Sequence, residues 1–84
     1  IENCAEFTKV TIPGNVEGVR GDAFEDFANL REAEILGYVY EVKRSLGGGV
    51  TLDIDWENPA ELAEHLKSGC YIEIKRAMSW RDRN

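Results

Sequence analysis

The segment Gly37–Trp56, GYVYEVKRSLGGGVTLDIDW, constrains the fold more than any other part of the chain. Apolar and polar residues alternate strictly over residues 50–56, which is the period of a strand with one buried face. The three consecutive glycines at 47–49 supply the positive φ angles that a tight turn between two strands needs. We therefore predict a β-hairpin over residues 38–56, with Trp56 largely buried.

The hydrophobic pattern also selects the register of this hairpin. A three-glycine loop places Val42 opposite Ile54 in the core and Lys43 opposite Asp53 on the outer face. A loop one residue longer places Lys43 opposite Leu52 and buries charge. We therefore predict the shorter loop.

The rest of the chain predicts two helices and two further strands. The strands are expected at Ala5–Ile12 and at residues 70–78, where β-branched or apolar residues alternate with polar ones. A capping box predicts a helix from Asp22 to about Glu32. A second helix is expected to begin at Asn58, with proline at its first position, and to end near Gly69.

The resulting order, β-α-β-β-α-β, predicts an α+β fold of the ferredoxin-like sandwich type. In it, a four-stranded antiparallel sheet with strand order 4-1-3-2 carries two helices on one face and leaves the other face open. Residues 1–84 are expected to form a single domain, with a polar tail at 79–84. Because the sequence begins at Ile1, a fragment of a longer chain is also an open alternative.

Composition restricts the classes of partner. The formal net charge is −6, and no apolar run approaches the length of a membrane helix. An acidic chain does not favour direct nucleic-acid binding, for which Lys and Arg neutralise phosphates, but it suits a basic protein partner. Cys4 and Cys70 are expected at opposite ends of the sheet as free thiols, which indicates a reducing compartment and a cytoplasmic location.

A glycine-containing loop precedes the first predicted helix and has the form of an anion cradle. Backbone amides, the helix dipole and an arginine would attract a phosphate or a carboxylate there. The residues of this predicted anion loop are Gly14, Asn15, Val16, Gly18 and Arg20.

The segments Gly14–Val19 (GNVEGV) and Gly37–Glu41 (GYVYE) resemble the acylphosphatase family, in which the corresponding patterns are G-R-V-Q-G-V and G-W-V-x-N. The resemblance covers roughly residues 12–75. It implies the ferredoxin-like fold and hydrolysis of small acyl phosphates, with Arg20 as the candidate catalytic residue.

Two positions depart from the family pattern. Asp22 stands where the family has its phosphate-binding arginine, and Glu41 stands where it has the asparagine that orients water. Two carboxylates would repel a dianionic substrate. The resemblance therefore supports the fold rather than the activity, and the hydrolase remains the alternative function.

Two further residue types are candidates for chemistry. His65 is expected on the flank of the second helix and Cys70 in the core, because neither has a metal-ligand or nucleophile partner at a motif spacing. No cofactor is expected. No metal site is expected either, since same-face acids on a strand lie about 6.6 Å apart, which suits a solvated face better than a cation cage.

The open sheet face is the leading candidate for function. It is expected to present an acidic and partly aromatic surface made of Glu41, Asp53, Asp55, Glu57, Phe7 and Tyr71. Such a surface suits a protein partner better than RNA, because basic residues do not surround it. The sequence therefore predicts a non-catalytic protein-interaction module, of the kind that inhibits a basic or nucleic-acid-binding partner.

Overall fold

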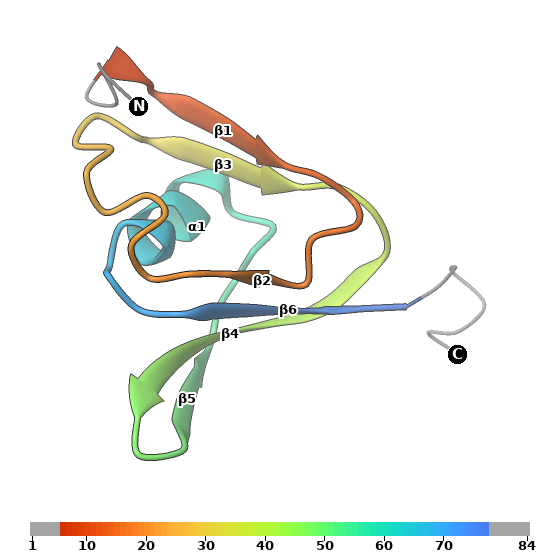
Figure 1. Cartoon of the computed structure of the whole chain (residues 1–84). Coiled ribbons are helices and arrows are strands. Elements are labelled where there is room, and N and C mark those ends of the chain that lie inside the picture. Colours follow the sequence, from red (N-terminus) through yellow and green to blue (C-terminus); the bar gives the residue numbers. More distant parts are fainter. Residues whose placement is uncertain (1–5, 78–84) are drawn as a thin grey trace.

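A computed structural model describes residues 6–77 of the chain. The elements along these residues are β1 (Lys9–Ile12), β2 (Gly18–Val19), β3 (Glu32–Ile35), β4 (Val39–Gly47), β5 (Val50–Asp53), α1 (Pro59–Leu66) and β6 (Ile72–Arg76). The fold is α+β, and its strands form two separate sheets (Figure 1).

The larger sheet has four antiparallel strands in the order β2-β6-β4-β5. The smaller sheet consists of β1 and β3, which pair in parallel, with Lys9 opposite Glu32 and Ile12 opposite Ile35. In Figure 1, α1 lies beneath the β1–β3 pair, and the β4–β5 hairpin projects from the other end of the molecule.

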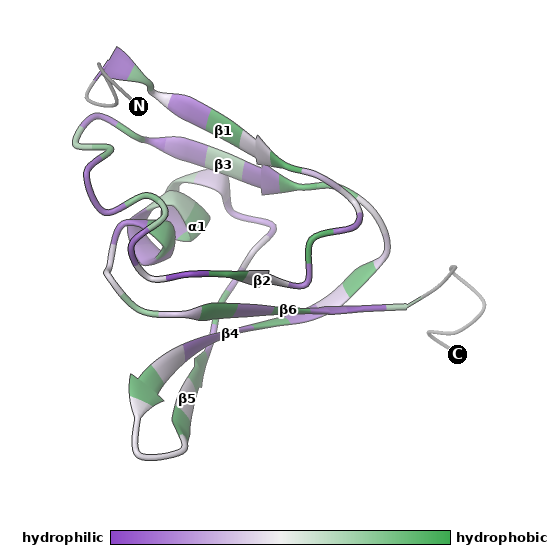
Figure 2. Cartoon of the chain, viewed as in Figure 1, coloured by the Kyte–Doolittle hydropathy of each residue, from purple (hydrophilic) through white to green (hydrophobic). Residues whose placement is uncertain are grey.

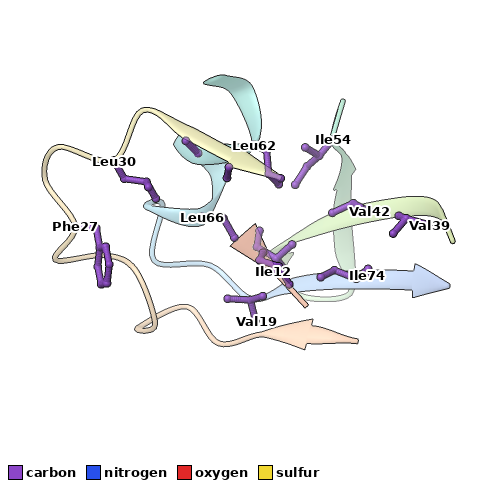
Figure 3. Packing of buried hydrophobic residues seen from close by; sticks show 13 residues of the cluster. Ile12, Val19, Phe27, Leu30, Val39, Val42, Ile54, Leu62, Leu66 and Ile74 are labelled. Carbon is purple, nitrogen blue, oxygen red and sulfur yellow. The ribbon is translucent and has the colours of Figure 1, made fainter. Parts of the chain in front are cut away.

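Both sheets, α1 and the turns between β2 and β3 contribute to one hydrophobic core. In the larger sheet, Val42 lies opposite Ile74, and the backbone N–H of Ile54 donates to the carbonyl oxygen of Val42 at 3.0 Å. These three side chains are buried. Figure 3 shows the cluster, whose buried members are Ile12, Val19, Phe27, Leu30, Ala33, Val39, Val42, Ile54, Leu62, Ala63, Leu66, Ile72 and Ile74.

The predicted helix from Asp22 to Glu32 is wrong, because the structure has consecutive turns there. The backbone N–H of Phe27 donates to the carbonyl oxygen of Phe24, and that of Leu30 donates to Phe27, both at 3.0 Å. These bonds span three residues, so the side chains of Phe27 and Leu30 both enter the core without an α-helix. The aspartates and the asparagine in this short stretch favour turns over a helix interior.

The ferredoxin-like arrangement is also wrong. It requires two helices on one sheet face, whereas the described residues contain one helix, and it places the first strand beside the last. The two-residue β2 occupies that place instead, with Gly18 opposite Glu73. The N–H groups of Arg31 and Glu32 both donate to the carbonyl oxygen of Thr8, which brings β3 alongside β1.

One arginine connects the two sheets. The guanidinium group of Arg76, at the end of β6, donates to the carbonyl oxygens of Pro13 at 2.8 Å and Val16 at 2.5 Å, and also to that of Leu36. Pro13 follows β1 and Leu36 follows β3, and these strands are parallel, so a single side chain holds the C-terminal end of the smaller sheet against the larger one.

The predicted hairpin and its register are confirmed. Lys43 lies opposite Asp53, and Gly47 to Gly49 all have positive φ. The loop is shorter than predicted, because Gly47 pairs with Val50 and only two residues remain in the turn. A β-bulge between Ser45 and Gly47 adds one residue to β4, and it restores the pairing that keeps Lys43 out of the core.

Burial along β5 differs from the prediction. The alternating pattern predicts that Val50 and Leu52 are buried. Both side chains are exposed, because this end of the hairpin projects beyond the hydrophobic core. Trp56, predicted to be largely buried, is partly buried and packs against the core.

The second predicted helix is confirmed as α1. The Asn58 side chain accepts hydrogen bonds from the backbone N–H groups of Ala60 and Glu61, at 3.1 and 3.2 Å, and Pro59 is the first helical residue. The helix ends at Leu66, and Gly69 follows with positive φ. Within residues 6–77, no helix combines the length and the hydropathy of a membrane span. Cys4 and the predicted polar tail at 79–84 lie outside the described residues.

Candidate functional site

The outer face of the larger sheet contains only part of the predicted acidic surface. Lys43 lies between two of its carboxylates, with Nζ 3.0 Å from Asp53 Oδ1 and 3.5 Å from Glu41 Oε2. Lys75 also reaches Glu41, at 3.5 Å. The pKa of Lys43 is raised, first by its hydrogen bond with Asp53 and then by the attraction of Asp53 and Glu41. The structure therefore brings Glu41 and Asp53 together around lysines.

The other two predicted acids lie elsewhere. Asp55 and Glu57 come after the end of β5, in the loop that leads to α1. The backbone N–H of Asp55 donates to Glu61 Oε2 at 3.1 Å, which turns the chain away from the sheet. Both side chains are exposed. The four carboxylates therefore do not share one strand face.

The two predicted aromatic residues lie on different parts of the fold. Phe7 precedes β1 and stacks on Phe27, with ring centroids 5.8 Å apart. Tyr71 precedes β6 and covers Gly18, where a Cβ atom would lie only 1.9 Å from the Tyr71 hydroxyl oxygen. A side chain at position 18 would therefore displace the ring of Tyr71, which is exposed.

The predicted anion loop borders a cavity of about 450 Å³. Its wall is mainly apolar, and is formed by Thr11, Ile12, Pro13, Val16, Gly18, Val19, Arg20, Asp22, Ala23 and Phe24. Gly14 and Asn15 are not part of this wall.

Arg20 and two carbonyl oxygens of this loop are already engaged. Arg20 Nη2 lies 3.2 Å from Asp22 Oδ2, and the Arg20 side chain is 82% exposed. The carbonyl oxygens of Pro13 and Val16 accept hydrogen bonds from Arg76. The cavity can therefore receive an apolar group beside the Arg20–Asp22 ion pair. Two carbonyl oxygens of the loop face the guanidinium group of Arg76.

The β4–β5 hairpin presents an exposed apolar surface that the sequence analysis assigned partly to the core. Leu46, Val50 and Leu52 are 50%, 58% and 42% exposed. Figure 2 shows these hydrophobic segments along the projecting hairpin. No other described strand pairs with the outer edge of β5. The hairpin thus offers both apolar side chains and unpaired backbone groups.

The structure also assembles a polar cluster that the sequence analysis did not find. Arg44 Nη1 lies 3.2 Å from His65 Nδ1, so the histidine nitrogen accepts this hydrogen bond. The pKa of the nearby Cys70 thiol is lowered, first by Arg44 and then by Ser68. The inward position of Arg44, two residues after Val42 on the same strand face, is the sequence signal that points to this cluster.

His65 lies on the flank of α1, where it was expected, whereas Cys70 differs from its expected core position. His65 is partly buried, with Nε2 3.8 Å from Glu61 Oε2, and Cys70 is a partly exposed free thiol rather than a core residue. Among residues 6–77, no group of three or more His, Cys, Asp or Glu is arranged to hold a metal ion.

No family model matches the chain, and no curated protein or solved structure matches it either.

Proposed function

We propose that this chain is a non-catalytic protein-interaction module that docks on a basic partner through the β4–β5 hairpin. The observation that carries this proposal is the free edge of β5, all four of whose residues are exposed. Exposed strand edges are templates for pairing with another chain.

The hydrogen-bond pattern identifies the backbone groups available at this edge. Ile54 donates to Val42, so the even-numbered residues of β5 face β4. In an antiparallel ladder the alternate residues face the other way. The N–H and C=O groups of Thr51 and Asp53 therefore point outward, where a partner strand would accept and donate hydrogen bonds.

The side chains of the hairpin add contact area and charge. Val50 and Leu52 supply apolar surface of the kind that interfaces bury. The chain as a whole carries a formal net charge of −6, which favours encounter with a basic protein. An inhibitor that covers the basic surface of a nucleic-acid-binding protein is one form of this function.

A pull-down from the native host lysate with two matched variants tests the proposal. Thr51→Pro removes one outward N–H without removing a bond to β4, whereas Thr51→Ala keeps that N–H. We expect a stoichiometric basic partner with the wild type and with Thr51→Ala, and its loss with Thr51→Pro. Equal capture by both variants, or the absence of any stoichiometric partner, contradicts the proposal.

A further inference from the structure

The outer face of the larger sheet carries a row of alternating charges that ends at the free edge of β5. Lys75 Nζ lies 3.5 Å from Glu41 Oε1. Lys43 Nζ lies 3.5 Å from Glu41 Oε2 and 3.0 Å from Asp53 Oδ1. The row thus runs from β6 through β4 to β5, and Asp53 is its last member.

Asp53 is the member of this row with unused capacity. Glu41 and Lys43 each have two opposite charges within 4 Å, whereas Asp53 has only Lys43 among residues 6–77. The Asp53 side chain is 74% exposed, against 34% for Glu41 and 23% for Lys43. A carboxylate accepts at both oxygens, so Asp53 Oδ2 remains available to a further donor. A strand added at this edge continues the row if it places a positive charge opposite Asp53.

The other face of β5 is apolar and uncovered. Side chains alternate along a strand, so Val50 and Leu52 lie on the same face as Ile54, which is buried in the core. Val50 and Leu52 themselves remain exposed. A strand added beside them therefore places every second side chain against apolar surface.

The hydrogen-bond pattern of β5 fixes which residues of an added strand lie closest. Thr51 and Asp53 hold the outward backbone groups, so each would form a hydrogen-bonded pair with an antiparallel strand. Leu52 would form the non-hydrogen-bonded pair between them, in which the Cα atoms are about 4.5 Å apart and the side chains are closest. Antiparallel pairing also continues the pattern of this sheet, in which all the described pairs are antiparallel.

We propose that the partner supplies an antiparallel strand in which polar and apolar residues alternate, with a lysine or arginine opposite Asp53 and an apolar residue opposite Leu52. The inference rests on the proposed function of the chain as an interaction module and names the chemistry of the segment that docks. The backbone groups of Thr51 and Asp53 hold the strand, and the side chains on the two faces of β5 select its sequence.

An NMR titration of the full chain with capped peptides tests this selection without knowledge of the partner. The peptide TTRVTVTT places its arginine opposite Asp53 and its valines opposite Leu52 and Val50. The peptide TTVRTVTT has the same composition, but its arginine and first valine are exchanged, so the alternation is lost. The backbone amide signals of Thr51 and Asp53 report binding. We expect saturable shifts with the alternating peptide and binding of the exchanged peptide that is about fivefold weaker or worse.

A third peptide isolates the charge opposite Asp53. It carries citrulline, the neutral near-isostere of arginine, and should bind the wild type about twofold to fivefold more weakly than the arginine peptide. Asp53→Asn should abolish this difference. Asp55→Asn is the matched control, because Asp55 lies beyond the end of β5, and it should preserve the difference. Unchanged backbone spectra away from the substituted residue confirm that both variants keep the fold.

Three results overturn the inference. They are equal binding of the exchanged and alternating peptides, a citrulline effect that persists in Asp53→Asn, and no binding of the alternating peptide. Shifts of the Thr51 and Asp53 signals that depend on the concentration of the chain alone also overturn it, because a second copy then occupies the edge.

Failure here is distinguishable from failure of the proposed function. If the alternating peptide does not bind but Thr51→Pro still abolishes capture of the partner, the strand chemistry alone is wrong. If no partner is captured but the peptides bind as expected, the interaction module is wrong and the strand preference of β5 stands.

Discussion

Arg76 Nη2 donates a hydrogen bond to the carbonyl oxygen of Pro13 at 2.8 Å, across 63 positions of the sequence. The same guanidinium group also bonds Val16 and Leu36. We predict that Arg76→Ala lowers the free energy of unfolding by about 2–3 kcal/mol, because carbonyl groups lose a charged donor. Arg76→Lys should recover only part of this loss, since an ammonium group does not match three divergent acceptors. Urea denaturation measures both values, and a change below about 0.5 kcal/mol for Arg76→Ala contradicts the linking role.

The register of the hairpin gives a direct spectroscopic prediction. Because Ile54 bonds Val42, the neighbouring pair Lys43 and Asp53 is a non-hydrogen-bonded pair with closely spaced Cα atoms. We expect a strong Hα–Hα cross-peak between Lys43 and Asp53. A corresponding cross-peak between Lys43 and Ile54 would instead show that the bulge at residues 45–47 is absent.

The ion pair of Lys43 predicts a pH dependence of stability. Its pKa is raised in the folded state, mainly by Asp53, so the pair stabilises the fold below the unfolded pKa and loses this effect as pH rises through the folded pKa. Asp53→Asn should therefore be less stable than the wild type near neutral pH. The difference should shrink in strongly alkaline solution, above the ordinary pKa of lysine.

Thermal unfolding at several pH values measures this difference. Asp55→Asn is the matched control, because Asp55 has no ion pair with a described residue, and it should leave stability nearly unchanged. An equal effect of the two substitutions at neutral pH contradicts the pairing.

The lowered pKa of Cys70 predicts a reactive thiol. In a Cys4→Ser background, Cys70 should react with a soluble aromatic disulfide faster at neutral pH than the same residue in the urea-unfolded chain. Arg44→Met should raise the midpoint of the pH–rate profile, because it removes the largest cause of the shift. An unchanged midpoint contradicts the contact between Arg44 and the thiol.

Hydrolysis of acyl phosphates should not exceed the buffer rate. The only arginine of the predicted anion loop lies 3.2 Å from Asp22, which leaves little net positive charge for a dianion. A benzoyl phosphate assay measures this rate, and Asp22→Asn tests whether the carboxylate suppresses activity. Hydrolysis by the wild type that disappears in Arg20→Ala would establish the alternative function instead.

Local sequence signals predicted the elements that depend on local chemistry. The capping of α1 by Asn58 and the glycine turn of the hairpin both rest on residues within a few positions of each other. The register was predictable because one wrong step would bury Lys43.

The remaining elements depend on contacts that are distant in sequence. The spacing of Phe24, Phe27 and Leu30 fits a helix as well as successive turns, and the turns are compatible with the bonds of Arg31 and Glu32 to Thr8. The pairing of β1 with β3 likewise depends on these bonds and on the hydrogen bonds that Arg76 donates to the ends of both strands. No periodic pattern in the sequence predicts either set of bonds.

The candidate site shows the same limit. Alternation placed Glu41 and Asp53 on the outer face correctly, but it extended β5 over Asp55 and Glu57, which belong to the loop before α1.

Amide hydrogen exchange in the free chain and in its complex with the captured partner tests the docking claim most directly. In the free chain, the N–H groups of Thr51 and Asp53 should exchange quickly and those of Leu52 and Ile54 slowly, because only the latter face β4. On binding, Thr51 and Asp53 should become protected. Protection confined to other parts of the chain, with both of these amides still exchanging freely in the complex, would contradict docking through the edge of β5.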